Sequence, residues 1–154
     1  MTTPTKPEPI AKTYQIISYG LGLFAAGIAV VQMVSFEEFA SALQDYGLGI
    51  NSIALAIMLI ALEIFSVPFL FRLSLSPLAR LLSALCVVLL PCAWTLLTAL
   101  ALTSHANVPN AGYLGGFADM RMSGLVLLFN VSWLTAVGFG FGQLGGYKAL
   151  KPRQ

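Results

Sequence analysis

The sequence carries very little charge. Only 9% of its 154 residues are Asp, Glu, Lys or Arg, whereas about a quarter of the residues are charged in a typical soluble domain. Hydrophobic residues make up 58% of the chain, and the mean hydropathy is +0.85. This composition excludes a soluble globular domain and indicates an integral membrane protein. The net charge of +2 is too small to indicate nucleic-acid binding.

Residues with catalytic or metal-binding chemistry are also scarce. The two cysteines, Cys86 and Cys92, form no C-x-x-C motif and lie on different faces of one predicted helix. No phosphate-binding glycine loop, no H-E-x-x-H motif and no Ser-His-Asp combination occurs. We interpret the single histidine, His105, as a loop residue and the tryptophans Trp94 and Trp133 as packing residues. We predict no catalytic residue and no metal site, and we do not expect catalysis by this chain alone.

Four apolar segments are long enough to cross about 30 Å of hydrocarbon as helices. They cover about residues 14–34, 51–71, 81–102 and 124–146. We therefore predict an all-α fold, an integral membrane four-helix bundle over residues 14–146. The proline-rich residues 1–13 are predicted to form a flexible cytoplasmic tail, and residues 147–154 a second, basic one.

A short amphipathic segment, residues 35–46, follows the first span. Its apolar residues recur at helical spacing on one face, and they are Phe36, Phe39, Ala40 and Leu43, with Tyr46 at the end. We predict an interfacial helix whose apolar face is turned toward the lipid or the bundle. Ser35 and Glu38 have the spacing of a capping box at its start.

Glycines form small-residue faces on the first and last spans. The first span contains Gly20, Gly22 and Gly27, and the last contains Gly138, Gly142 and Gly146 in two overlapping G-x-x-x-G steps. Such faces allow another helix to approach closely, either within the bundle or from a partner protein.

Lysine and arginine predict the orientation. Seven of the eight lie in the two tails and in the linker between the second and third spans, namely Lys6, Lys12, Arg72, Arg80, Lys148, Lys151 and Arg153. Because cytoplasmic loops are enriched in these residues, both termini are predicted to be cytoplasmic. The 35–46 helix and the 103–123 loop are then outside. The apolar residues Tyr113, Leu114 and Phe117 predict that this loop folds back onto the mouth of the bundle.

Glu63 is the only carboxylic acid inside a predicted span. An ionised carboxylate at the bilayer centre costs roughly 3 kcal/mol, so Glu63 must face protein and be either protonated or paired. Two interpretations stay open. Glu63 is a proton relay or a polar contact to a quinone or ion, or it is a neutral acid that hydrogen-bonds a neighbouring helix. We favour the second, with the candidate partners Tyr19, Ser66, Thr95 and Asn130.

Two segments carry a family resemblance, F-E-E-F-A-S-A-L-Q-D-Y-G-L at 36–48 and A-L-E-I-F-S-V-P-F-L-F at 61–71. Together with the four spans they resemble the DoxX-like and MauE-like membrane proteins over roughly residues 15–146. The matching positions are Phe39, Leu43, Tyr46, Leu48 and Glu63. The resemblance implies a bacterial inner membrane and a link to quinone-linked oxidoreductases or to maturation of periplasmic redox enzymes. The cysteine pair usual in the MauE-like outer loop is missing here, which argues against a thiol relay.

We therefore expect a non-catalytic accessory or assembly subunit of a larger bacterial membrane complex, related to redox or electron transfer. Its partners would be the lipid bilayer and other membrane subunits, with no cofactor of its own. One alternative is the membrane subunit of a quinone-linked oxidoreductase, with a quinone near Glu63. Another is a small transporter or lipid-binding protein.

Overall fold

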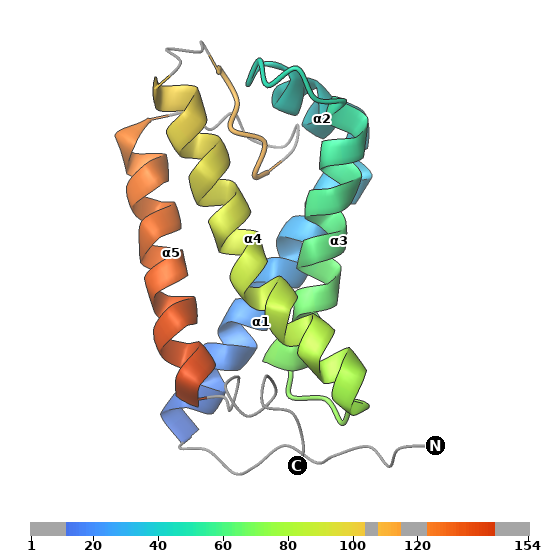
Figure 1. The fold of residues 1–154 in the computed structure, drawn as a ribbon, viewed down its shortest axis with the longest axis vertical. Coiled ribbons are helices and arrows are strands. Elements are labelled where there is room, and N and C mark those ends of the chain that lie inside the picture. The colour runs from blue at the N-terminus through green and yellow to red at the C-terminus, as the bar shows by residue number, and fades with distance from the viewer. Residues whose placement is uncertain (1–11, 104–107, 115–122, 144–154) are drawn as a thin grey trace.

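The computed structural model describes residues 12–103, 108–114 and 123–143, with side chains as far as residue 138 in the last range. In this part of the chain five helices form (Figure 1), and they are α1 (Lys12–Val34), α2 (Phe36–Gln44), α3 (Ser52–Leu70), α4 (Pro77–Thr103) and α5 (Gly124–Gln143). The predicted all-α fold is confirmed. Residues 1–11, His105 and the predicted C-terminal tail lie outside the described residues.

Three of the helices, α1, α3 and α4, are long and apolar enough to cross a membrane. The apolar part of α5 that the structure describes, Gly124–Gly138, is shorter. The third span begins earlier than the predicted residue 81. Its first helical residue is Pro77, where proline is favourable because that position needs no amide donor. Ser76 precedes it and accepts a hydrogen bond from the Ala79 amide at 3.3 Å.

The bundle is organised around α3, which packs against α1, α2 and α4, while α5 packs mainly on α4. Figure 1 shows α2 beside the start of α3, at the same end of the bundle as the C-terminal end of α4. The 108–114 segment enters the bundle at this same end. We call it the α2 end.

A serine joins α3 to α4 close to the proline in α3. The Ser83 hydroxyl donates to the Phe65 carbonyl at 2.6 Å and accepts from the Phe69 amide at 2.9 Å. Pro68 lies between these two residues of α3 and has no amide to donate. A hydroxyl from the neighbouring helix therefore supports the backbone of α3 where its own ladder is weakest.

The glycine at which α1 approaches its neighbour most closely is Gly22. A Cβ added there would lie 3.1 Å from the Phe71 ring and 3.2 Å from Leu70. At Gly20, Gly27 and Gly138 an added Cβ meets nothing within 4 Å. These three predicted packing glycines therefore make no close approach within the described bundle, and contact with a partner protein stays a prediction for them. The contacts of Gly142 and Gly146 lie outside the described part of the chain.

The α2 helix turns its apolar face toward the bundle. Phe39, Leu43 and Tyr46 are at most 2% exposed, and Phe36 packs half-buried beside them. The capping box predicted at Ser35 is wrong, since its side chain makes no cap hydrogen bond to α2. Because Ser35 directly follows α1, its hydroxyl donates instead to the Val31 carbonyl of that helix at 2.9 Å.

Candidate functional site

Glu63 lies deep in α3 and is fully buried, with 0% of its surface exposed. At a rise of 1.5 Å per residue, it is about 16 Å along the helix axis from Ser52. The prediction that this acid must face protein agrees with its burial. Its two carboxyl oxygens have no hydrogen-bond partner among the described residues.

Two further side chains surround the carboxyl group. Two polar groups interact with the Glu63 carboxyl group, and they are the indole N–H of Trp94 in α4 and the side-chain amide of Gln32 in α1. Both residues are 0% exposed. Neither residue forms a hydrogen bond with the Glu63 carboxyl group. Gln32 Oε1 and Trp94 Nε1 also have no hydrogen-bond partner among the described residues. We call these three side chains the Glu63 centre.

The Glu63 centre is energetically unusual. Four polar atoms from three different helices are buried in the bundle interior, and none makes a hydrogen bond within the described part of the chain. A buried donor or acceptor left unpaired costs about 1–3 kcal/mol, so the fold tolerates a substantial local penalty here. Penalties of this kind are typical of functional positions in membrane interiors.

A fully bonded polar chain lies directly beside the centre. The Tyr113 hydroxyl donates to Asn130 Oδ1 in α5 at 2.5 Å, and Asn130 Nδ2 donates to Thr98 Oγ1 in α4 at 2.9 Å. Thr98 in turn donates to the Trp94 carbonyl at 2.8 Å. Gln32 joins this chain through its amide nitrogen, which donates to the Tyr113 carbonyl at 3.4 Å. Only the amide oxygen of Gln32 remains unpaired.

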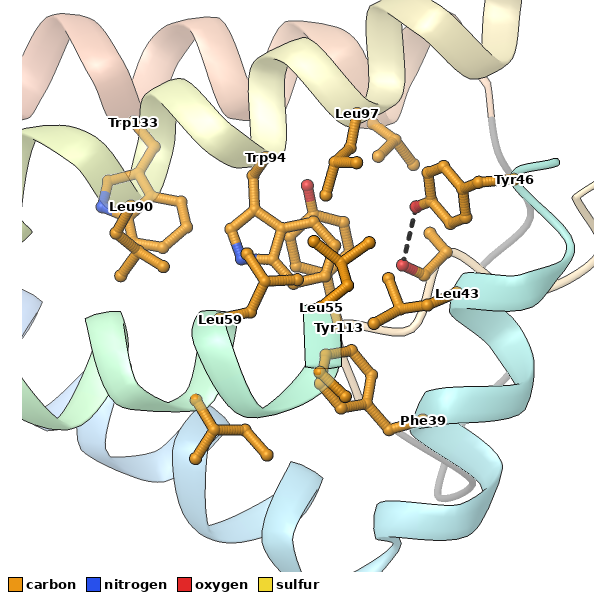
Figure 2. Close-up of a cluster of buried hydrophobic side chains, with 14 of the residues drawn as sticks. Phe39, Leu43, Tyr46, Leu55, Leu59, Leu90, Trp94, Leu97, Tyr113 and Trp133 are labelled. Carbon is orange, nitrogen blue, oxygen red and sulfur yellow. Dashed lines mark hydrogen bonds between the residues drawn. The ribbon is translucent and has the colours of Figure 1, made fainter. Parts of the chain in front are cut away.

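Aromatic packing fixes the Trp94 side chain. Its ring stacks on Tyr113 with centroids 4.2 Å apart, and Phe39 lies 6.3 Å away on the side of α2. Figure 2 shows Trp94 extending from α4 toward α3, with Leu59 below its nitrogen edge and Tyr113 behind it. The indole N–H is therefore held in one direction by stacked rings.

The 108–114 segment covers the centre at the α2 end. It is irregular, but Val108, Ala111 and Tyr113 are all buried, as the prediction that this loop folds back requires. The Tyr46 hydroxyl of the α2 end donates to the Ala111 carbonyl at 2.9 Å, the bond drawn in Figure 2. Burial raises the pKa of Tyr46 and of Tyr113 well above the ordinary value, so both hydroxyls keep the protons that they donate.

The four hydrogen-bond partners predicted for Glu63 bond elsewhere, and the prediction is wrong for each. The Ser66 hydroxyl donates to the backbone carbonyl of Glu63 at 2.7 Å, and Thr95 donates to the Pro91 carbonyl at 2.7 Å. Tyr19 accepts from Gln15 and stacks on Phe71. Asn130 belongs to the neighbouring polar chain. Ser66 and Thr95 each donate to a carbonyl of their own helix, as is common where a hydroxyl reaches a carbonyl about one turn back.

Two members of the centre were not predicted as site residues. Gln32 carried a usable signal, because an uncharged amide inside the apolar first span is costly unless it meets another polar group. Trp94 was predicted to pack, and it does, but the direction of its N–H could not be derived from spacing. Together with Glu63 they bring one buried donor and two kinds of buried acceptor into one cluster, which suits proton binding or the hydrogen bonding of a small polar group.

Comparison with protein-family models gives no match, and searches of curated proteins and of solved structures give none either.

Proposed function

We propose that the protein is a non-catalytic accessory or assembly subunit of a larger redox-related complex in a bacterial inner membrane. In this proposal α5 is the fourth span, both termini are cytoplasmic, and the chain is a DoxX-like or MauE-like scaffold. The observation that carries it is the distribution of polarity. The polar side chains of Gln32, Glu63 and Asn130 are buried at 0% exposure. The open glycines and many large apolar side chains, such as Ile16, Leu23 and Phe65, are exposed on the outside of the bundle.

The open glycine face of α1 offers a direct test of this proposal. Gly20 and Gly27 lie on one face of the helix and have free space beyond the Cβ position, so Gly20→Leu with Gly27→Leu should leave the fold intact. A partner helix seated on that face would be displaced. We expect the native protein to migrate with stoichiometric partners on native gels after mild solubilisation, and the double variant to lose them.

The matched control is Ile16→Leu, on the same helix at a position that is 70% exposed and already bears a large side chain. It should retain the partners, which mass spectrometry of the excised band would identify. A native protein that migrates alone would contradict the accessory-subunit proposal.

The Glu63 centre supports a second candidate, the membrane subunit of a quinone-linked oxidoreductase. The specific observation is that four buried polar atoms have no hydrogen-bond partner among the residues that the structure describes. In this case Glu63→Gln abolishes quinone-coupled turnover of the complex while the protein still inserts into the membrane. Unchanged turnover in that variant would remove the quinone role.

The stability of Glu63 variants tests whether the carboxyl group stabilises the folded protein. Where no bound molecule pairs with the carboxyl group, Glu63→Leu is expected to raise the free energy of unfolding by about 1–3 kcal/mol, because it removes two unpaired oxygens from an apolar interior. Glu63→Gln keeps polar atoms at the same place and should gain less. Thermal melting in detergent measures both, and a clear loss of stability in Glu63→Leu would show that the carboxyl group has a structural role.

A further inference from the structure

The unpaired atoms of the Glu63 centre define what can bind there. Trp94 Nε1–H is a donor and cannot accept, whereas Gln32 Oε1 is an acceptor and cannot donate. The Glu63 carboxyl group accepts when ionised and can also donate when protonated. A ligand that pairs with all of these atoms must both accept and donate hydrogen bonds.

These requirements separate the classes of small ligand. A metal cation would meet the indole N–H, and an anion would meet the carboxyl oxygens, so each has one unfavourable neighbour. A carbonyl oxygen accepts from Trp94 but leaves Gln32 Oε1 without a donor. A hydroxyl oxygen accepts from the indole and donates to the acid or the amide. Buried hydroxylic molecules in proteins behave in this way, since an internal water makes about three hydrogen bonds to polar groups otherwise unpaired.

We propose that the Glu63 centre is a binding site for one hydroxyl oxygen, held between the indole N–H of Trp94 and the acceptors of Glu63 and Gln32. Two of its groups are held in place by other contacts. Stacking on Tyr113 fixes the indole, and the bond to the Tyr113 carbonyl fixes the Gln32 amide with its oxygen free. The hydroxyl comes either from water or from an alcohol or phenol dissolved in the bilayer. This inference is independent of the accessory-subunit proposal, because it concerns the interior of the bundle.

The chain provides its own spectroscopic reporter for this site. It contains two tryptophans, so Trp133→Phe leaves Trp94 as the only one. Trp133 lies on α5, with Phe24 of α1 as an edge-on neighbour at 5.4 Å. A hydroxyl bonded to the indole N–H shifts the fluorescence of Trp94 to longer wavelength and makes its intensity sensitive to replacement of H₂O by D₂O.

The experiment compares purified Trp133→Phe protein in H₂O and in D₂O, and then during titration with 4-propylphenol. Bound water gives a red-shifted emission with a D₂O effect before any phenol is added. A bilayer-derived hydroxyl gives a saturable red shift only on adding the phenol. Adding Gln32→Leu and Glu63→Leu to this protein should shift the Trp94 emission to shorter wavelength and abolish either response.

The matched control is Trp94→Phe, which leaves only Trp133 and whose emission should not respond to Glu63→Leu. Trp94 emission that responds neither to D₂O nor to the phenol would overturn the proposal. This test uses the Trp133→Phe protein, which has no substitution in the Glu63 centre. It therefore remains valid even where the variant that also carries Gln32→Leu and Glu63→Leu does not fold. The fluorescence response of Trp94 does not depend on whether partner subunits are found on native gels. The hydroxyl-site proposal and the accessory-subunit proposal can therefore be contradicted independently.

Discussion

Gly112→Ala is expected to lower the free energy of unfolding by about 2–4 kcal/mol. Gly112 has a φ of +81°, in the left-handed region, where a residue with a Cβ is strained by roughly 1–2 kcal/mol. The added methyl group would also lie 3.2 Å from the Phe39 ring. Phe39 is fully buried and cannot move aside freely, and overpacking of this kind costs roughly 1–3 kcal/mol. Thermal melting of the purified protein in detergent measures the effect.

Gly47→Ala is the matched control. Gly47 also has a positive φ, +63°, but an added Cβ meets nothing within 4 Å. It should therefore show the backbone strain alone, about 1–2 kcal/mol. Equal losses in the two variants would mean that the 108–114 segment does not press against α2 as the structure shows.

Asn130→Ala is expected to cost about 2–4 kcal/mol. Asn130 is fully buried, and it both accepts from Tyr113 and donates to Thr98. Truncation leaves the Tyr113 hydroxyl buried without a partner, which alone costs about 1–3 kcal/mol, and it also leaves a small cavity. Because Asn130 joins α5, α4 and the 108–114 segment, we expect its truncation to weaken the packing of all three.

A double-mutant cycle isolates this bond. Tyr113→Phe removes the other partner, so the double variant should lose clearly less stability than the sum of the two single variants, with a coupling energy of about 0.5–3 kcal/mol. Thr135→Val on the same helix provides the control, because Thr135 is exposed and donates to the Val131 carbonyl of its own helix. Strictly additive losses for Asn130 and Tyr113 would show that their hydrogen bond contributes nothing.

The helices were predictable because the bilayer allows so few choices. A chain in hydrocarbon must satisfy its backbone internally, so long apolar segments become helices whatever their neighbours are. The predicted spans at 14–34 and 51–71 accordingly lie within two residues of α1 and α3. The start of α4 was predicted too late, at about residue 81, because the prediction followed hydropathy alone. Ser76 and Pro77 form a typical helix start, and this capping pattern would have indicated the correct boundary.

The contacts between helices were much less predictable. Lipid is as apolar as leucine, so the inward face of a membrane helix has no simple hydrophobic signature. Gly22 rather than Gly20 or Gly27 makes the close approach, and only the crossing of α1 with the end of α3 decides this. For the same reason Glu63 was recognised as costly, while Gln32 and Trp94, its neighbours in space, could not be paired with it from spacing.

The bond from Tyr46 to Ala111 has a consequence for biogenesis. Its two residues are 65 positions apart, so the donor leaves the ribosome well before the acceptor. Until α4 has been inserted, Phe39, Leu43 and Tyr46 have nothing from the 108–114 segment to pack against, and the amphipathic α2 helix must rest on the membrane surface. The α2 end of the bundle therefore closes late in synthesis, and a nascent chain truncated before residue 108 should expose α2 to added protease, whereas the full-length chain should protect it.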